Sequence, residues 1–292
     1  LYAGPMENPN TMRVRQQFTS VAPRLLEAIS RCGDPDCVLT RIARLLGNLH
    51  ASGAIYDVLG LYPHLCDYLV LLADNSALLT NILINDPGLF DEFSRPEMLG
   101  SSLDKNALDD ELENLLFSYG PEAALYRFKE GNLFRIGLRD LVGVADSERV
   151  GHELTLLSDV CVGNILKEAI ERTSRRYGEF YCPFGILGLG KSGGRELGYG
   201  SDLDLIFVYS PTESAASVEY EICTAVAAEV IRRLKERTRH GVLYDVDARL
   251  RPYGKQGTLV ISVDRLAEYY SFEAHGWERL ALLKARCIAG TF

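Results

Sequence analysis

Three aspartates in the last third of the chain have the type and spacing to act together. Asp202 and Asp204 lie in the segment "GYGSDLDLIFVY", and Asp247 lies in "GVLYDVDARLRP". Side chains two residues apart in a strand point to the same face, so Asp202 and Asp204 are predicted to lie side by side. If the strand that carries Asp247 is their neighbour, three carboxylates meet at one surface of a sheet.

Carboxylates held this close repel one another, and a divalent cation between them removes that cost. Hard oxygen ligands at this spacing suit Mg²⁺ or Mn²⁺. Three carboxylates suit two ions about 3.5–4 Å apart, which clamp an in-line displacement at phosphorus. We therefore interpret Asp202, Asp204 and Asp247 as metal ligands and catalytic residues. The alternative is that Asp202 and Asp204 only cap a strand on a solvated face. The glycine-rich segment before them, together with Asp247, disfavours it.

Groups that suit a nucleotide's phosphates surround these aspartates in the sequence. Arg249 and Arg251 lie on the polar side of the alternating segment "GVLYDVDARLRP" and suit phosphate oxygens. Glycines permit close approach of the backbone to a phosphate. The predicted nucleotide-binding residues are Gly190, Lys191, Gly193, Gly194, Ser201, Arg249 and Arg251. A plain surface position stays open as the alternative for Lys191, and it is the favoured interpretation of Asp245.

The stretch "GILGLGKSGG", residues 185–194, also fits two well-known phosphate-binding patterns, and we reject both. A P-loop needs a loop between a strand and a helix that begins at its Lys-Ser pair. Here Gly185 to Leu189 lies within an apolar strand pattern, and Gly193 and Gly194 make a poor first helical turn. A dinucleotide fingerprint needs an acidic residue about 20 positions later, at the end of a second strand. Asp202 and Asp204 come too early and open a strand.

The elements that must position these residues change in character near residue 176. Before it, apolar residues recur at three- and four-residue intervals, which predicts helices almost throughout residues 12–176. After it, "FGILGLG", "DLDLIFVY", "GVLYDVDARLRP" and "TLVIS" predict strands, "SVEYEICTAVAAEVIRRLKERT" predicts a helix, and residues 263–289 are predicted to be helical again. The sequence thus predicts an α+β protein, with a helical region over 1–176 and a catalytic domain over 177–292 that holds a small mixed sheet and flanking helices.

Composition narrows the possible partners. The net charge of −9 disfavours non-specific nucleic-acid binding, which needs clustered cations. The seven dispersed cysteines form no C-x-x-C pair and predict reduced thiols in a cytoplasmic protein. No apolar run reaches the length of a membrane span, and the first twenty residues lack a signal peptide's apolar core. Because the chain begins with Leu1, we expect it to be part of a longer protein.

Three blocks of the sequence closely resemble the glutamine synthetase adenylyltransferase family. They are "GLGKSGGRELGYGSDLDLIFVY", "VDARLRPYGKQGTLVIS" and "YYSFEAHGWERLALLKAR", in the family's order. The upstream helices match more loosely, and the likeness covers about residues 35–290. The resemblance implies a polymerase-β-like nucleotidyltransferase fold and one of the family's two catalytic halves, with a downstream part missing.

The resemblance also implies substrates, partners and a mechanism. Asp202 and Asp204 would bind two Mg²⁺ ions, and Asp247 would ligate one of them and orient or deprotonate the nucleophile. ATP would be the substrate. The protein substrate would be glutamine synthetase, and a PII-type regulatory protein would act through the full-length chain, with no nucleic acid or membrane involved. We favour transfer of AMP to a tyrosine hydroxyl, as part of the control of nitrogen assimilation.

Other functions stay open at this point. The first is removal of AMP by phosphorolysis to give ADP, because "RPYGKQGTLV" and "WERLALLKAR" look more like the deadenylylating half. A nucleotide-sensing or docking domain without activity is disfavoured by the intact Asp202, Asp204 and Asp247. A transferase with a small molecule or RNA as acceptor also stays open, although the acidic net charge disfavours RNA.

Overall fold

The computed structural model describes residues 10–48, 54–90, 100, 103–178, 182–212 and 216–292. The chain divides into two compact units, one of Leu1–Ser102 with Glu130–Asp146, the other of Leu103–Lys129 with Ser147–Phe292. These units are defined by how the chain packs, and the helix that precedes residue 176 packs with the sheet of the second unit. The predicted division into two domains near residue 176 therefore stays a prediction.

The first unit consists of helices in its described part, as the apolar periodicity predicts. They are α1 (Asn10–Ser30), α2 (Pro35–Asn48), α3 (Ala54–Leu61), α4 (His64–Asn75), α5 (Ala77–Asn85) and the second half of α9 (Pro121–Leu141). In α2 the buried side chains Val38, Ile42, Leu45 and Leu46 form one stripe. Ser76 separates α4 from α5, since its hydroxyl accepts the Leu79 N–H at 3.2 Å as an N-cap.

Among the described residues, no single helix has the length and apolar character to cross a membrane. Within the same residues, the helix pair Ile55–Leu61 and His64–Asn75 has that length and apolar character when the two are taken together. The pair is bent by 113°, and one such pair is weak evidence for a membrane span.

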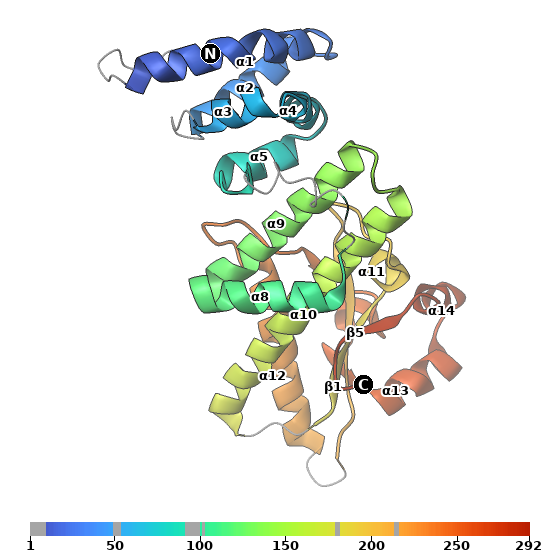
Figure 1. Cartoon of the computed structure of the whole chain (residues 1–292). Helices are drawn as coiled ribbons and strands as arrows, with labels where there is room; N and C mark the ends of the chain where they lie inside the picture. The colour runs from blue at the N-terminus through green and yellow to red at the C-terminus, as the bar shows by residue number, and fades with distance from the viewer. Residues whose placement is uncertain (1–9, 49–53, 91–99, 101–102, 179–181, 213–215) are drawn as a thin grey trace. The chain divides into compact units, whose positions relative to one another are not determined.

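The second unit is a mixed five-stranded sheet with helices on both sides (Figure 1). Its strands are β1 (Phe184–Gly188), β2 (Leu203–Tyr209), β3 (Val246–Asp247), β4 (Val260–Ser262) and β5 (Arg286–Gly290). Its other elements are α8 (Lys105–Tyr119), the first half of α9, α10 (Ser147–Tyr177), α11 (Gly190–Gly194), α12 (Ala216–Lys235), a 3₁₀ turn η1 (Gly254–Gln256), α13 (Val263–Glu268), a π-helical turn η2 (Tyr269–Glu273) and α14 (Gly276–Leu282). The predicted α+β class with a mixed sheet is confirmed.

Strand β2 is the central strand of this sheet. It pairs with β1 in antiparallel fashion, and with β3 and then β4 in parallel fashion on its other side. Ile206 and Val208 join Leu189 and Ile261 in a core cluster, which Leu266 of α13 and Leu282 of α14 help to cover. In Figure 1, α10 and α12 lie on the other side of the sheet. Because β2 is buried on both faces, its sequence is an almost continuous apolar run.

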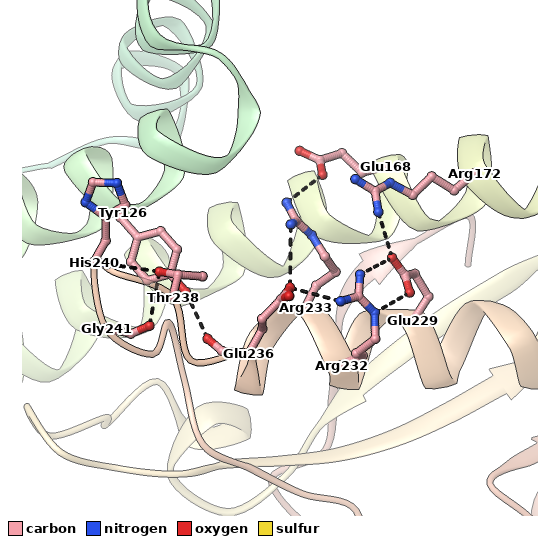
Figure 2. Close-up of polar contacts among 10 residues, drawn as sticks. All are labelled: Tyr126, Glu168, Arg172, Glu229, Arg232, Arg233, Glu236, Thr238, His240 and Gly241. Atoms are coloured by element: carbon pink, nitrogen blue, oxygen red, sulfur yellow. Dashed lines mark hydrogen bonds and ion pairs between the residues drawn. The ribbon is translucent and has the colours of Figure 1, made fainter.

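Charged side chains join α12 to α10 (Figure 2). Arg233 donates to Glu168 at 3.0 Å, and Arg172 donates to Glu229 at 3.2 Å. Glu229 also pairs with Arg232 at 2.8 Å on its own helix. At the end of α12, the Tyr126 hydroxyl donates to the carbonyl of Glu236 at 3.1 Å. These contacts fix α12, which precedes the segment that returns the chain to the sheet at β3.

Two sequence predictions about this unit are wrong. The alternating segment 241–252 forms only the two-residue strand β3, and residues 286–290, predicted as helix, form strand β5 at the sheet edge. In the first case a local turn replaces the strand, as described below. In the second, Arg286–Gly290 pairs with β1 through a register shift between Ile186 and Leu187. That long-range pairing leaves little signal in a five-residue segment.

Candidate functional site

Two of the three predicted aspartates are register partners in the sheet. Asp204 is the second residue of β2, and it pairs with Asp247 of β3 in the parallel ladder. Adjacent strands lie about 4.8 Å apart, so the two carboxylates start from neighbouring backbone positions. Asp202 is exposed and lies just before β2. The Leu203 N–H donates to the carbonyl of Asp245 at 2.9 Å, which extends the ladder to this end. The structure therefore brings the predicted acidic residues to one end of β2.

The electrostatics of Asp204 show an excess of negative charge. Partial burial raises the pKa of Asp204, and the charges of Asp247 and then Asp202 raise it further. Arg249 and Lys191 act in the opposite direction. All three carboxylates are thus close enough to interact, and a cation placed among them would stabilise their charged forms.

Asp247 is in a different environment because Arg249 holds it. The Arg249 Nε lies 2.7 Å from Oδ2 and 2.9 Å from Oδ1 of Asp247, and its Nη2 also donates to Oδ2. These hydrogen bonds lower the pKa of Asp247. The backbone N–H of Arg249 donates to Asp247 Oδ1 at 2.8 Å, which makes a side-chain-capped turn. This turn ends β3, and it is the physical reason why the alternating sequence does not continue as a strand.

A divalent metal ion fits the chemistry of these residues. The donors are hard carboxylate oxygens, as Mg²⁺ prefers. The backbone makes room for them, since a Cβ at Gly190 would lie 2.6 Å from Oδ2 of Asp204. Among the described residues, no three His, Cys, Asp or Glu side chains are already arranged to hold a metal ion. The Asp247 carboxylate is instead engaged by Arg249, whose side chain is 64% exposed and has solvent to move into.

The glycine-rich segment lies against this end of the sheet. The pattern's first glycines, Gly185 and Gly188, belong to β1, as predicted. Contrary to our expectation, Gly193 and Gly194 are helical, in the short helix α11. Gly193 is required there by packing, because a Cβ would lie 2.1 Å from the carbonyl oxygen of Lys284. Gly190 begins α11 with a φ of +52°, a conformation that suits glycine.

The other predicted nucleotide-binding residues differ in their surroundings. Lys191 is exposed on α11, with its charge felt at Asp204. The Ser201 hydroxyl accepts the Gly198 N–H at 3.0 Å within the turn before β2. The Arg251 guanidinium donates to main-chain carbonyls, at 2.5 Å to Ala248 and at 2.9 Å to Thr258. Arg251 therefore organises its own loop, and its predicted contact with phosphate stays a prediction.

Two further ionic contacts support the site, and sequence reasoning missed both. Arg286 of β5 donates to Asp159 of α10 at 2.6 and 3.0 Å, and to the carbonyl of Ser192 in α11 at 2.9 Å. Burial raises the pKa of Asp159, while Arg286 acts in the opposite direction. The ammonium of Lys284 also pairs with Glu196, after α11. The only sequence signal was the pair of cations "LLKAR", whose acidic partners lie about 90 and 130 residues away.

A mixed sheet that gathers carboxylates at one end, beside a tight glycine-rich turn, is an arrangement suited to transferring a nucleotidyl group. The comparison with protein families agrees with this class. The model of the family described as glutamate-ammonia ligase adenylyltransferase matches residues 66–292. This match spans well over half of the chain, and the chain belongs to that family. It is therefore a member of a nucleotidyltransferase enzyme family, as the resemblance implied, and glutamate-ammonia ligase is glutamine synthetase.

Proposed function

We propose that this chain transfers AMP from ATP to a tyrosine hydroxyl of glutamine synthetase. The observation that carries the proposal is the register pairing of Asp204 with Asp247, next to the glycine-rich segment. The family membership supports the general activity, and the sequence "ELGYGSDLDLIFVY" favours this direction.

In this proposal Asp202, Asp204 and Asp247 hold two Mg²⁺ ions, or Mn²⁺ in their place. When bound, such ions neutralise charge on the phosphoryl oxygens and align the reacting groups. Asp247 accepts the proton of the tyrosine hydroxyl, and the phenolate oxygen attacks the α-phosphorus. A new oxygen–phosphorus bond forms at AMP while the bond to pyrophosphate breaks. Lys191 and the glycines of α11 approach the phosphates.

In this proposal Arg249 binds two different groups in turn. In the free protein it neutralises Asp247. We infer that it turns to the phosphates of ATP when nucleotide enters, since a guanidinium forms bidentate contacts with phosphate as readily as with carboxylate. That exchange frees the Asp247 carboxylate at the moment when its charge is required.

The second candidate is the removal of AMP by phosphorolysis. Inorganic phosphate attacks the phosphorus of AMP–tyrosine, the bond from that phosphorus to the tyrosine oxygen breaks, and the products are ADP and the free tyrosine hydroxyl. The segments "RPYGKQGTLV" and "WERLALLKAR" favour it. We place either reaction in the cytoplasm, consistent with seven free cysteines, and we expect regulation through a PII-type protein and the longer chain.

Two reciprocal assays test the proposal. The chain is incubated with Mg²⁺, unmodified glutamine synthetase and ATP labelled at the α-phosphate, and separately with AMP-labelled glutamine synthetase and inorganic phosphate. Label gained by the protein in the first assay supports adenylylation, and labelled ADP in the second supports the alternative. Labelled ADP in the second assay without any label in the first would reject adenylylation in favour of the alternative. The absence of both products would contradict both reactions.

A further inference from the structure

Helix α14 exposes large apolar side chains and buries an acidic one. Its buried side chain is an acid: Glu278 is 8% exposed, accepts the Tyr269 hydroxyl at 2.7 Å, and accepts the His275 N–H at 2.8 Å. Two of its large apolar side chains face outward, with Trp277 at 61% and Leu280 at 67% exposed, as does the following Leu283 at 77%, while Leu282 packs on the core. Amphipathic helices normally bury such residues against the core.

A further exposed apolar side chain lies in the turn before α14. Positions 277, 280 and 283 follow one another at helical spacing, and Leu283 keeps a helical backbone. Phe272 of η2 is 83% exposed, and its neighbour Ser271 accepts a hydrogen bond from Arg279 of α14 at 3.2 Å. We call Phe272, Trp277, Leu280 and Leu283 the α14 ridge. Its apolar area is on the order of 500 Å², as large as the functional patches of typical monomers.

The α14 ridge is next to the candidate site. Asp204 shares a face of β2 with Ile206 and Val208 by strand alternation, and Leu282 of α14 packs on that same cluster. At the end of α14 the backbone of Lys284 closes against Gly193 of the glycine-rich segment. Lys284 also pairs with Glu196 in the segment that follows α11. The ridge is therefore the outer side of the helix whose inner side and C-terminal end border the site.

We propose that the α14 ridge is the surface on which this enzyme docks its protein substrate, glutamine synthetase; this rests on the proposed function. A nucleotide or a phosphate ion needs no apolar surface of this size. A protein acceptor does, because its reacting hydroxyl must be held by contacts beyond the reacting atoms. Trp, Phe and Arg are enriched in protein interfaces, and the ridge offers an exposed Trp and Phe with the exposed Arg279 beside them in the sequence.

The test uses a double variant, Leu280→Gln with Leu283→Gln, and a matched control, Phe117→Gln. Phe117 is 96% exposed on α8 and lies outside the ridge. All three positions are on the surface, so the variants should fold, which circular dichroism and thermal unfolding check. The affinity for glutamine synthetase is measured by biolayer interferometry, and that for nucleotide with a fluorescent ATP analogue. Transfer is also measured to a short peptide that carries the acceptor tyrosine, which bypasses docking.

The proposal predicts that the double variant binds glutamine synthetase at least tenfold more weakly, while Phe117→Gln binds like the wild type. Nucleotide affinity and transfer to the peptide should stay within twofold. Unchanged affinity for glutamine synthetase in the double variant would overturn the proposal. So would sedimentation showing that the ridge only pairs two copies of this chain. If the wild type binds nucleotide but modifies neither protein nor peptide in either direction, the proposed function itself fails and the docking proposal falls with it.

Discussion

Replacing Gly190 by alanine tests how tightly the glycine-rich segment and the carboxylates are coupled. Gly190 has a φ of +52°, and a Cβ there would lie 2.6 Å from Asp204 Oδ2. A left-handed conformation costs a non-glycine residue about 1–2 kcal/mol. In addition, the carboxylate must retreat by about 0.8 Å to reach the 3.4 Å at which ordinary contact begins. The strand cannot move with it easily, because the Leu189 N–H donates to the carbonyl of Asp204 at 2.9 Å.

We therefore expect Gly190→Ala to lower the free energy of unfolding by roughly 1–2 kcal/mol. It should also lower the metal-dependent turnover by about 10- to 100-fold, since displacements near 1 Å in a reacting constellation cost that much. Urea unfolding and the rate of label transfer across a Mg²⁺ titration measure the two effects. The matched control is Gly200→Ala, because a Cβ at Gly200 has no atom within 4 Å, and it should change neither.

The result that would refute this reasoning is a Gly190→Ala protein that loses stability but keeps wild-type turnover and Mg²⁺ dependence. That outcome would mean that the position of the Asp204 carboxylate next to Gly190 is not important for metal-dependent turnover.

Three further predictions follow from single contacts. Lys191→Ala should raise the KM for nucleotide several-fold with little change in kcat, because Lys191 is exposed near Asp204; initial rates over an ATP series check this, and a loss confined to kcat would contradict it. Gly193→Ala should lower the free energy of unfolding by about 3 kcal/mol, because overpacking against the Lys284 carbonyl forces the backbone to shift; urea unfolding within 0.5 kcal/mol of the wild type would refute it. Hydrogen bonds from Arg232 lower the pKa of Glu229, so the stability advantage of the wild type over Glu229→Gln should be full above the ordinary glutamate pKa of about 4.3. That advantage should fade as the pH falls through the lowered pKa; a difference that grows toward acid pH in thermal unfolding would contradict it.

The long apolar patterns predicted the elements well because local and tertiary preferences agree there. The last helix of the region predicted to be helical, α10, ends at Tyr177, and Gly178 follows with a φ of +96°. The strand in "DLDLIFVY" is β2, and its residues Leu203, Leu205 and Phe207 are fully buried. Such runs are long enough for the hydrophobic period to identify them.

Short segments were predicted less well because single contacts, local or remote, decide them. The alternation around Asp247 stops after two residues, since its carboxylate caps a turn at Arg249 rather than leaving the chain extended. Strand β5 exists because β1 offers an edge, which no periodicity within 286–290 reveals. The glycines of α11 form a helical turn that Gly193 makes possible by close approach to Lys284. No sequence pattern predicts that the residues in these contacts pair with one another.

For the candidate site, the sequence predicted which acids meet but not their partners. Asp204 and Asp247 are register neighbours because the strands that carry them pair in parallel, as the prediction for Asp247 required. The engagement of Asp247 by Arg249, and of Arg251 by main-chain carbonyls, depends on loop geometry. The roles of all these residues in binding metal and nucleotide are predictions that the variants test.

The most direct test of the central claim is the rate of AMP transfer by Asp204→Asn, measured in the direction in which the wild type works. Asparagine keeps the size of the side chain and removes its charge, so thermal unfolding and circular dichroism should confirm an intact fold. We predict a loss of about 10³-fold, larger than the 10- to 100-fold typical for groups that act only through a metal ligand. A rate within a few-fold of the wild type would contradict the claim that these carboxylates converge to hold the catalytic metal.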